Sequence, residues 1–265
     1  MLKDIITIGG LTIHGYGLMI AIGFMLAVFV AVHRAKAYGL NQEAILDIAL
    51  IAIISGFVGA KLLFVIVSFD EFIEDPLGVL GSEGFVVYGG IIAGVLACML
   101  YSMKKKLSFM SYFDVVMPSI SIAQGFGRIG CFMAGCCYGR ETNSAIGVVF
   151  PVDSMAPAGV RVLPTQLFSA AGDFLIAGIL ITYARRAKYK GNTAALYLVL
   201  YGVGRFLIEF LRDDERGAVG FLSTSQFISI FFVIIAGVLF YANKKRGEEA
   251  DRLIGKSNEQ QEGSL

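Results

Sequence analysis

The sequence predicts an all-α integral membrane protein with about seven transmembrane helices. Of its 265 residues, 56% are hydrophobic and 16% are charged, and the mean hydropathy is +0.72. Soluble domains carry about 45–50% apolar and about 25% charged residues, so the bilayer is the main solvent of this chain. Windows of about 20 mostly apolar residues, the length that spans a bilayer, recur along it. They lie at 12–32, 45–67, 85–103, 113–133, 166–184, 194–211 and 224–243.

The loops between these windows differ in their basic residues. Loops after the first, third, fifth and seventh windows carry Arg34, Lys36, Lys104, Lys105, Lys106, Arg185, Arg186, Lys188, Lys190, Lys244, Lys245 and Arg246. The opposite set carries Lys3, Arg140, Arg161, Arg212 and Arg216. Because loops rich in Lys and Arg stay in the cytoplasm, we expect the N-terminus outside and the C-terminus inside.

The predicted membrane domain covers residues 1–246. Residues 247–265 are polar, and we expect them to form a disordered cytoplasmic tail. The longest outer loop, 140–165, holds three prolines and is expected to be irregular, capping a site on the outer face. A net charge of +1 gives no reason to expect a nucleic-acid partner.

Three cationic residues fall inside predicted spans: Lys61, Arg128 and Arg205. A charge at depth costs several kcal/mol unless it faces the protein interior or a polar cavity. At about 1.5 Å per residue, all three lie roughly 16–24 Å from the cytoplasmic ends of their spans. We therefore expect them to share the outer half of the membrane.

Arg205, Glu209 and Arg212 follow one another at i, i+4 and i+7, which places them on one face of the sixth span. In one interpretation these charges only neutralise one another or reach the outer headgroups. In the other, Arg128 and Arg205 converge on an anion, because the guanidinium fork suits a phosphate. The nearest phosphate is a phospholipid headgroup, so this interpretation predicts a site for an anionic lipid.

The segment 127–139, Gly-Arg-Ile-Gly-Cys-Phe-Met-Ala-Gly-Cys-Cys-Tyr-Gly, resembles the signature of the prolipoprotein diacylglyceryl transferase family. Four further pieces follow the order of that family. They are Tyr16-Gly17-Leu18-Met19, Tyr88-Gly89-Gly90, Pro164-Thr165-Gln166-Leu167, and Gly204-Arg205-Phe206 continuing through Glu209 to Arg212. The resemblance covers nearly all of residues 12–243.

The resemblance implies a multi-pass enzyme of the bacterial inner membrane, with its site facing the outer leaflet. Such an enzyme transfers the diacylglyceryl group of phosphatidylglycerol to the lipobox cysteine thiol of a prolipoprotein, forming a thioether and releasing glycerol phosphate. Its partners would be phosphatidylglycerol, prolipoprotein signal peptides with a lipobox, and membrane lipids.

The resemblance also assigns roles to residues. Arg128 and Arg205 would be the essential catalytic arginines at the headgroup, and Tyr16 and Gly139 would shape the pocket. Glu209 and Arg212 would complete a charged network. Lys61 joins the expected substrate-binding set through its depth in the membrane.

Three positions depart from the usual family pattern. Cys131 stands where Asn is common, Cys136 where Glu is common, and Tyr88 where many members have His. Tyrosine has an unperturbed pKa of about 10 and is a poor base. Tyr88 is therefore a catalytic candidate to which we do not assign the role of base. The substrate thiol could be deprotonated by a lipid phosphate oxygen, by water, or with help from Tyr88.

Cys131, Cys136 and Cys137 have the spacing C-x4-C-C, which is unusual for zinc, and no histidine lies near them. The sequence thus predicts no metal and no cofactor. The rival function is a transporter or channel for a small anion, because intramembrane arginines also suit a translocation path. The absence of a visible internal repeat and the outward position of the cations favour the transferase.

Overall fold

The computed structural model describes residues 4–8, 11–152, 154–213 and 217–262. The chain divides into two compact units, of which unit 1 is Met1–Val30 with Phe113–Leu265 and unit 2 is Ala31–Tyr112. The chain passes from one unit to the other within helices α1 (Gly15–Ala37) and α6 (Phe109–Ala134).

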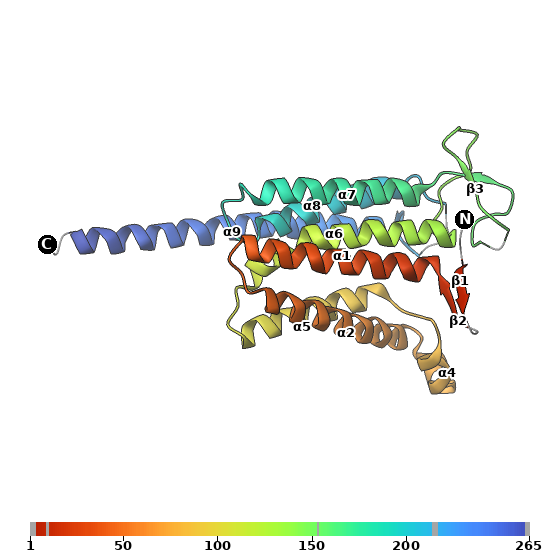
Figure 1. The fold of residues 1–265 in the computed structure, drawn as a ribbon, viewed down its shortest axis with the longest axis horizontal. Helices are drawn as coiled ribbons and strands as arrows, with labels where there is room; N and C mark the ends of the chain where they lie inside the picture. Colours follow the sequence, from red (N-terminus) through yellow and green to blue (C-terminus); the bar gives the residue numbers. More distant parts are fainter. Residues whose placement is uncertain (1–3, 9–10, 153, 214–216, 263–265) are drawn as a thin grey trace. The chain divides into compact units, whose positions relative to one another are not determined.

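Each predicted window corresponds to a helix in the structure, with ends within a few residues of the predicted bounds except at the end of the last helix, which continues well beyond residue 243 (Figure 1). Besides α1 and α6, these helices are α2 (Gln42–Val67), α5 (Val87–Lys104), α7 (Thr165–Ala184), α8 (Asn192–Glu209) and α9 (Thr224–Glu262). Two short helices, α3 (Phe69–Glu74) and α4 (Pro76–Gly81), lie between α2 and α5. The prediction of a mostly helical membrane protein is confirmed.

Five helices among the described residues are long and apolar enough to cross a membrane: α1, α2, α5, α7 and the Thr224–Glu249 part of α9. Helices α6 and α8 carry charged and amide side chains within their length, including Gln124, Arg128, Arg205 and Glu209. The count of seven spans and the orientation of the termini stay predictions.

The described strands form three two-stranded antiparallel ladders. β1 (Asp4–Ile8) pairs with β2 (Leu11–His14), β3 (Val148–Val149) with β4 (Arg161–Val162), and β5 (Ala218–Val219) with β6 (Leu222–Ser223). The N-terminal hairpin was not predicted, although β-branched runs on both sides of Gly9-Gly10 are its sequence signal. The described part of loop 140–165 contains β3 and β4, and no helix occurs in it before α7 begins at Thr165.

Helix α9 continues to Glu262, through residues whose composition predicted a disordered tail, and residues 263–265 lie outside the described chain (Figure 1). The segment after Gly247 is rich in Glu, Lys, Arg and Gln, which are good helix formers. Extending an existing helix avoids the unfavourable nucleation step, so these residues prolong α9.

In unit 1, α8 packs between α7 and α9 (Figure 1), and polar bonds tie α6 to α8. The Asp114 carboxylate of α6 accepts the backbone N–H groups of Gly191 at 2.6 Å and Ala194 at 2.9 Å. These groups begin α8, where free N–H donors favour a negative charge. The Tyr197 hydroxyl of α8 donates to Gln124 Oε1 of α6 at 2.8 Å.

The buried hydroxyl of Ser121 ties α6 to α7, because it donates to the backbone carbonyl of Asp173 at 2.7 Å. Within a bilayer, polar groups must find their partners inside the protein. These bonds link α6 and α8, which carry charged and amide side chains within their length, to neighbouring helices.

Helix α1 approaches α6 closely through small residues. A Cβ added at Gly23 would lie 2.6 Å from Phe126 Cβ, and one added at Gly130 would lie 3.1 Å from the Tyr16 ring. Glycine at these positions therefore allows the two backbones to approach. This contact places Tyr16, in the first turn of α1, against α6.

In unit 2, α2 and α5 form a closely packed pair of helices. A Cβ added at Gly59 would meet Ala93 Cβ and would lie 2.6 Å from the carbonyl oxygen of Gly89. A Cβ added at Gly90 would lie 2.6 Å from the carbonyl oxygen of Gly56. These glycines allow backbone-to-backbone contact between the helices.

Gly59→Ala is expected to lower the thermal stability of the protein in detergent, because overpacking a tight contact costs about 1–3 kcal/mol. Gly94→Ala on α5 is the control, since its Cβ would have no neighbour closer than the Ala52 carbonyl oxygen at 3.8 Å. Thermal unfolding of both variants in one detergent measures the difference. Equal melting temperatures would contradict the packing described here.

Candidate functional site

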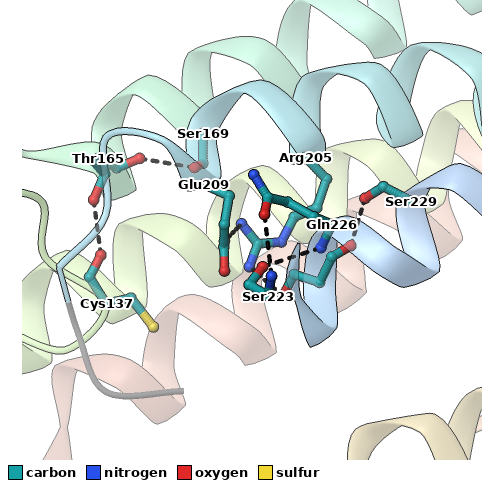
Figure 2. A network of polar contacts seen from close by, with 9 residues as sticks. Cys137, Thr165, Ser169, Arg205, Glu209, Ser223, Gln226 and Ser229 are labelled. Carbon is teal, nitrogen blue, oxygen red and sulfur yellow. Dashed lines mark hydrogen bonds and ion pairs between the residues drawn. The ribbon is translucent and has the colours of Figure 1, made fainter. Parts of the chain in front are cut away.

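An ion pair within α8 lies at the centre of the site. Arg205 and Glu209 are 2.7 Å apart between nitrogen and oxygen, and their side chains are 11% and 7% exposed. A second nitrogen of Arg205 donates to the Ser225 hydroxyl of α9 at 2.7 Å. Figure 2 shows the guanidinium held between its own helix and α9. The i, i+4 pairing predicted from the sequence is therefore confirmed.

Asp173 of α7 connects the two arginines predicted to converge. Its buried carboxylate interacts electrostatically with Arg128 of α6 and with Arg205 of α8. Arg128 interacts in addition with Tyr201 and Cys131. Three helices thus contribute charges to one cluster, and its carboxylate in the middle was not among the predicted site residues. The sequence signal for it was an acidic residue inside an apolar span.

A cavity of about 350 Å³ lies where α8 ends and α9 begins. Its polar lining comes from Arg140, Glu209, Arg212, Ser223 and Gln226. This volume lies within the range of small-molecule sites, about 300–1,000 Å³. Glu209 belongs to both the ion pair and the cavity wall, so the cavity adjoins the charged cluster.

The wall at the start of α9 is fixed by a capping box. The backbone N–H of Ser223 donates to Gln226 Oε1, and the backbone N–H of Gln226 donates to the Ser223 hydroxyl, both at 3.1 Å. This reciprocal pair satisfies donors that a helix leaves free at its start. Figure 2 shows the Ser223 and Gln226 side chains beside the Arg205–Glu209 ion pair.

The charges of the helix cluster and of the cavity lining, taken together, do not cancel. Arg128, Arg140, Arg205 and Arg212 are positive, whereas Asp173 and Glu209 are negative, which leaves an excess of two positive charges among these six residues. A low-dielectric interior strengthens the attraction of such an excess for an anion. Arg140 was assigned to a loop by the sequence and was missed as a site residue.

Gly139 joins the segments that carry the cavity arginines. Its N–H donates to the Leu163 carbonyl at 2.9 Å, and it forms an antiparallel bridge with Arg212. The next N–H, of Arg140, donates to the Leu211 carbonyl at 2.9 Å. A Cβ at Gly139 would lie 2.7 Å from the Leu211 carbonyl oxygen, so only glycine fits here without a shift.

Three cysteines of unit 1 meet after the end of α6. The Sγ atoms of Cys131, Cys136 and Cys137 all lie within 4.8 Å of one another. Hydrogen bonds with Cys131 and Cys136, together with the charge of Arg212, lower the pKa of the Cys137 thiol from its ordinary value. The spacing along the chain gave no sign of this convergence, because a turn after α6 produces it.

Tyr16 lies close to the same group. Its hydroxyl interacts electrostatically with the three cysteines and with Arg128, and its ring packs over Gly130 of α6. The structure therefore brings Tyr16, Arg128, Arg205, Glu209, Gly139 and Arg212 into unit 1, as neighbours through these contacts.

Lys61 and Tyr88 belong to unit 2. The Lys61 amine donates to the carbonyls of Ser82 at 2.7 Å and Gly84 at 3.3 Å, and it lies 4.9 Å from the Phe85 ring centre. These contacts tie α2 to the segment before α5. Tyr88 lies in the first turn of α5 with its side chain 37% exposed. That Lys61 and Tyr88 belong to the functional site stays a prediction.

The chain matches the family model of prolipoprotein diacylglyceryl transferase over residues 3–242. It belongs to the prolipoprotein diacylglyceryl transferase family. It is 45% identical over 243 residues to phosphatidylglycerol–prolipoprotein diacylglyceryl transferase 2 of Clostridium perfringens, covering 91% of this chain and 94% of the relative. It is 47% identical over 239 residues to the phosphatidylglycerol–prolipoprotein diacylglyceryl transferase of Clostridium tetani, covering 89% of this chain and 96% of the relative.

A more distant relative with the same name, from Finegoldia magna, is 36% identical over 243 residues, covering 91% of this chain and 94% of the relative. The alternative of a small-anion transporter or channel is not supported by these comparisons. The resemblance noted in the sequence is confirmed. In this member of the prolipoprotein diacylglyceryl transferase family, the charged cluster occupies α6, α7 and α8. Three of the five motif segments overlap these helices and extend slightly beyond their ends.

Glu209→Gln is expected to destabilise the protein strongly, because removing one partner of a buried ion pair costs about 3–5 kcal/mol. Glu248→Gln is the matched control. It changes the same residue type in a pair with Lys244 whose side chains are 65% and 49% exposed, and such pairs contribute about 0–1 kcal/mol. Thermal unfolding of the two variants in the same detergent gives the comparison. A Glu209→Gln protein as stable as the control would show that the pair does not balance Arg205.

Proposed function

We propose that this protein transfers the diacylglyceryl group of phosphatidylglycerol to the lipobox cysteine thiol of prolipoproteins, forming a thioether and releasing glycerol phosphate. The observation that carries the proposal is the excess of positive charge beside a cavity in a chain of otherwise apolar helices. The printed names of the relatives contain both substrates, phosphatidylglycerol and prolipoprotein.

The proposal includes a position in the membrane. All seven long helices cross the inner membrane of a bacterium, with the N-terminus outside, the C-terminus inside and the cavity in the outer leaflet. Two observations support this orientation. Basic residues gather at the C-terminal ends of α1 and α5, directly after α7, and within α9 beyond its apolar part, and the cavity lies at the end of α8 opposite the basic loop that precedes it. The membrane domain is residues 1–246, and residues 247–265 form a cytoplasmic extension.

The cavity suits a phosphoglycerol headgroup better than phosphate alone. Arg128 and Arg205, with Arg140 and Arg212 at the cavity, provide donors and positive charge for the phosphate. The Glu209 carboxylate lines the same cavity and can accept hydrogen bonds from glycerol hydroxyls. Donors for an anion and an acceptor for hydroxyls therefore lie in one site.

In the proposed reaction, the thiol sulfur of the acceptor attacks the glyceryl carbon of the diacylglyceryl group. The carbon–oxygen bond to the phosphate breaks, and its electron pair stays on the departing glycerol phosphate. Arg128 and Arg205 stabilise the charge that develops there, as fixed positive groups do in a low-dielectric site. The thiol is deprotonated by a phosphate oxygen of the lipid, by water, or with help from Tyr88.

The remaining predicted residues have supporting roles. Tyr16 and Gly139 shape the pocket, since one packs on α6 beside Arg128 and the other joins the cavity segments without room for a side chain. Lys61 contributes to lipid binding through its depth in α2. Its place in this proposal rests on the sequence and not on a contact with the arginines.

Arg128→Ala and Arg205→Ala are each expected to reduce transfer about 100-fold or more, the effect of removing a donor that stabilises transition-state charge. Purified protein in phosphatidylglycerol liposomes is incubated with a lipobox peptide, and mass spectrometry follows the diacylglyceryl adduct on its cysteine. Arg161→Ala is the control, because Arg161 is an exposed arginine of the loop that lies outside the cavity lining.

Normal turnover in either arginine variant would overturn the assigned roles. Folded wild-type protein that forms no adduct would overturn the proposed function itself.

A further inference from the structure

The cysteine cluster defined by Cys131, Cys136 and Cys137 is not used by the proposed reaction. None of the three forms a disulfide, all are of intermediate burial, and their sulfurs lie within 4.8 Å of one another. The fourth cysteine of the chain, Cys98, is buried on α5 in unit 2. The clustered sulfurs come from the last turn of α6 and the turn after it.

The backbone that presents these thiols is held in an unfavourable conformation. Cys137 has a φ of +64°, in the left-handed region. A residue with a Cβ pays about 1–2 kcal/mol there, and such strain collects at functional sites. Glycine or asparagine would suit this backbone better, so a thiol at this position indicates a use for the side chain.

Two side chains at the start of α7 bind the backbone of the turn that follows α6. The Thr165 hydroxyl donates to the Cys137 carbonyl at 2.8 Å, and Gln166 Nε2 donates to the Cys136 carbonyl at 2.7 Å. Both α7 residues are almost completely buried. Figure 2 shows the Cys137 carbonyl directed at Thr165 and its sulfur on the other side. The two carbonyls are thus bound by α7, while the sulfurs of Cys136 and Cys137 lie close to that of Cys131.

Gln166 gives a second observation beside the cluster. Its Oε1 atom is buried and makes no hydrogen bond to any residue that the structure describes, although its Nε2 is bound to Cys136. A buried acceptor without a partner is uncommon in folded proteins and often marks a bound water or ion. An ion with a water ligand next to Cys136 would explain this atom.

Three converging sulfurs match the ligands of a thiophilic cation. Zn²⁺ binds thiolates at about 2.3 Å, which places sulfurs of a tetrahedral site about 3.8 Å apart. The sulfurs here therefore need to move by no more than about 1 Å to reach that geometry. Three thiolates and a divalent ion leave one negative charge, and the Arg212 side chain at Cys137 supplies the opposite charge.

We propose that Cys131, Cys136 and Cys137 bind one thiophilic divalent cation of the Zn²⁺ class, with a fourth ligand from outside the cluster. The spacing C-x4-C-C predicted no metal, because zinc sites with four protein ligands repeat pairs of cysteines two to four residues apart. The turn after α6 replaces the second pair by folding Cys136 and Cys137 back onto Cys131. The proposal concerns ion binding and does not depend on the proposed reaction.

The test measures zinc uptake by the full-length protein in detergent. The thiols are first reduced and the protein is freed of metal, and Zn²⁺ is then titrated against a chromophoric chelator. Wild-type protein and Cys98→Ser are expected to bind about one Zn²⁺ per chain. Cys131→Ser, Cys136→Ser and Cys137→Ser are each expected to lose at least about tenfold in affinity. Circular dichroism and gel filtration verify that every variant is folded.

A second measurement needs no variant. Zn²⁺ is expected to protect the three clustered cysteines of wild-type protein from N-ethylmaleimide, as counted by mass spectrometry of peptides. No stoichiometric uptake by reduced wild-type protein, uptake unchanged in Cys136→Ser, or alkylation unchanged by Zn²⁺ would each overturn the proposal. If the cluster forms a disulfide and binds no Zn²⁺ after reduction, the proposal is overturned and the cysteines are a redox pair.

Discussion

The balance of charge inside an apolar helix bundle is the constraint on which this structure depends. Arg205 is buried with Glu209, and Asp173 interacts electrostatically with both Arg205 and Arg128. A guanidinium in such surroundings is tolerated only when carboxylates or a bound anion compensate it. The carboxylates compensate part of the charge, and the remainder attracts an anion. The same charges that demand polar contacts for α6 and α8 thus give the protein its candidate site.

The polar bonds between helices follow from this constraint. Asp114 caps α8 from α6, Gln124 meets Tyr197, and Ser121 binds the backbone of Asp173. Each bond satisfies a group that lipid could not satisfy, and together they fix the helices that carry the arginines. Unit 2 is organised differently, by close glycine contacts between α2 and α5. Packing dominates there, whereas polar bonds dominate around the site.

The long helices could be predicted from the sequence because apolar windows of spanning length leave little alternative in a bilayer. Even α6 and α8, which carry charges, were found from their remaining apolar residues. The β1–β2 hairpin was missed, since a short β-branched run is ambiguous without its partner. The helical continuation of α9 was missed because composition alone does not reveal that a helix already begun can be extended.

For the site, the cost of charge inside the membrane and the helical spacing identified Arg128, Arg205, Glu209 and Arg212, and the family resemblance added Tyr16 and Gly139. Arg140 could not be recognised, because it enters the cavity only through the backbone bonds around Gly139. The cysteine cluster could not be recognised either, since left-handed backbone at Gly135 and Cys137 creates it. Both depend on loop geometry, which residue spacing does not encode.

If Arg128 and Arg205 hold an anionic lipid, the protein retains that lipid when it is transferred to mixed micelles. Protein exchanged into micelles with equal amounts of phosphatidylglycerol and phosphatidylcholine is examined by native mass spectrometry, as wild type and as the double variant Arg128→Gln with Arg205→Gln. We expect the wild type to retain phosphatidylglycerol selectively and the folded double variant to lose this selectivity. Equal retention of phosphatidylglycerol by the two proteins would contradict it.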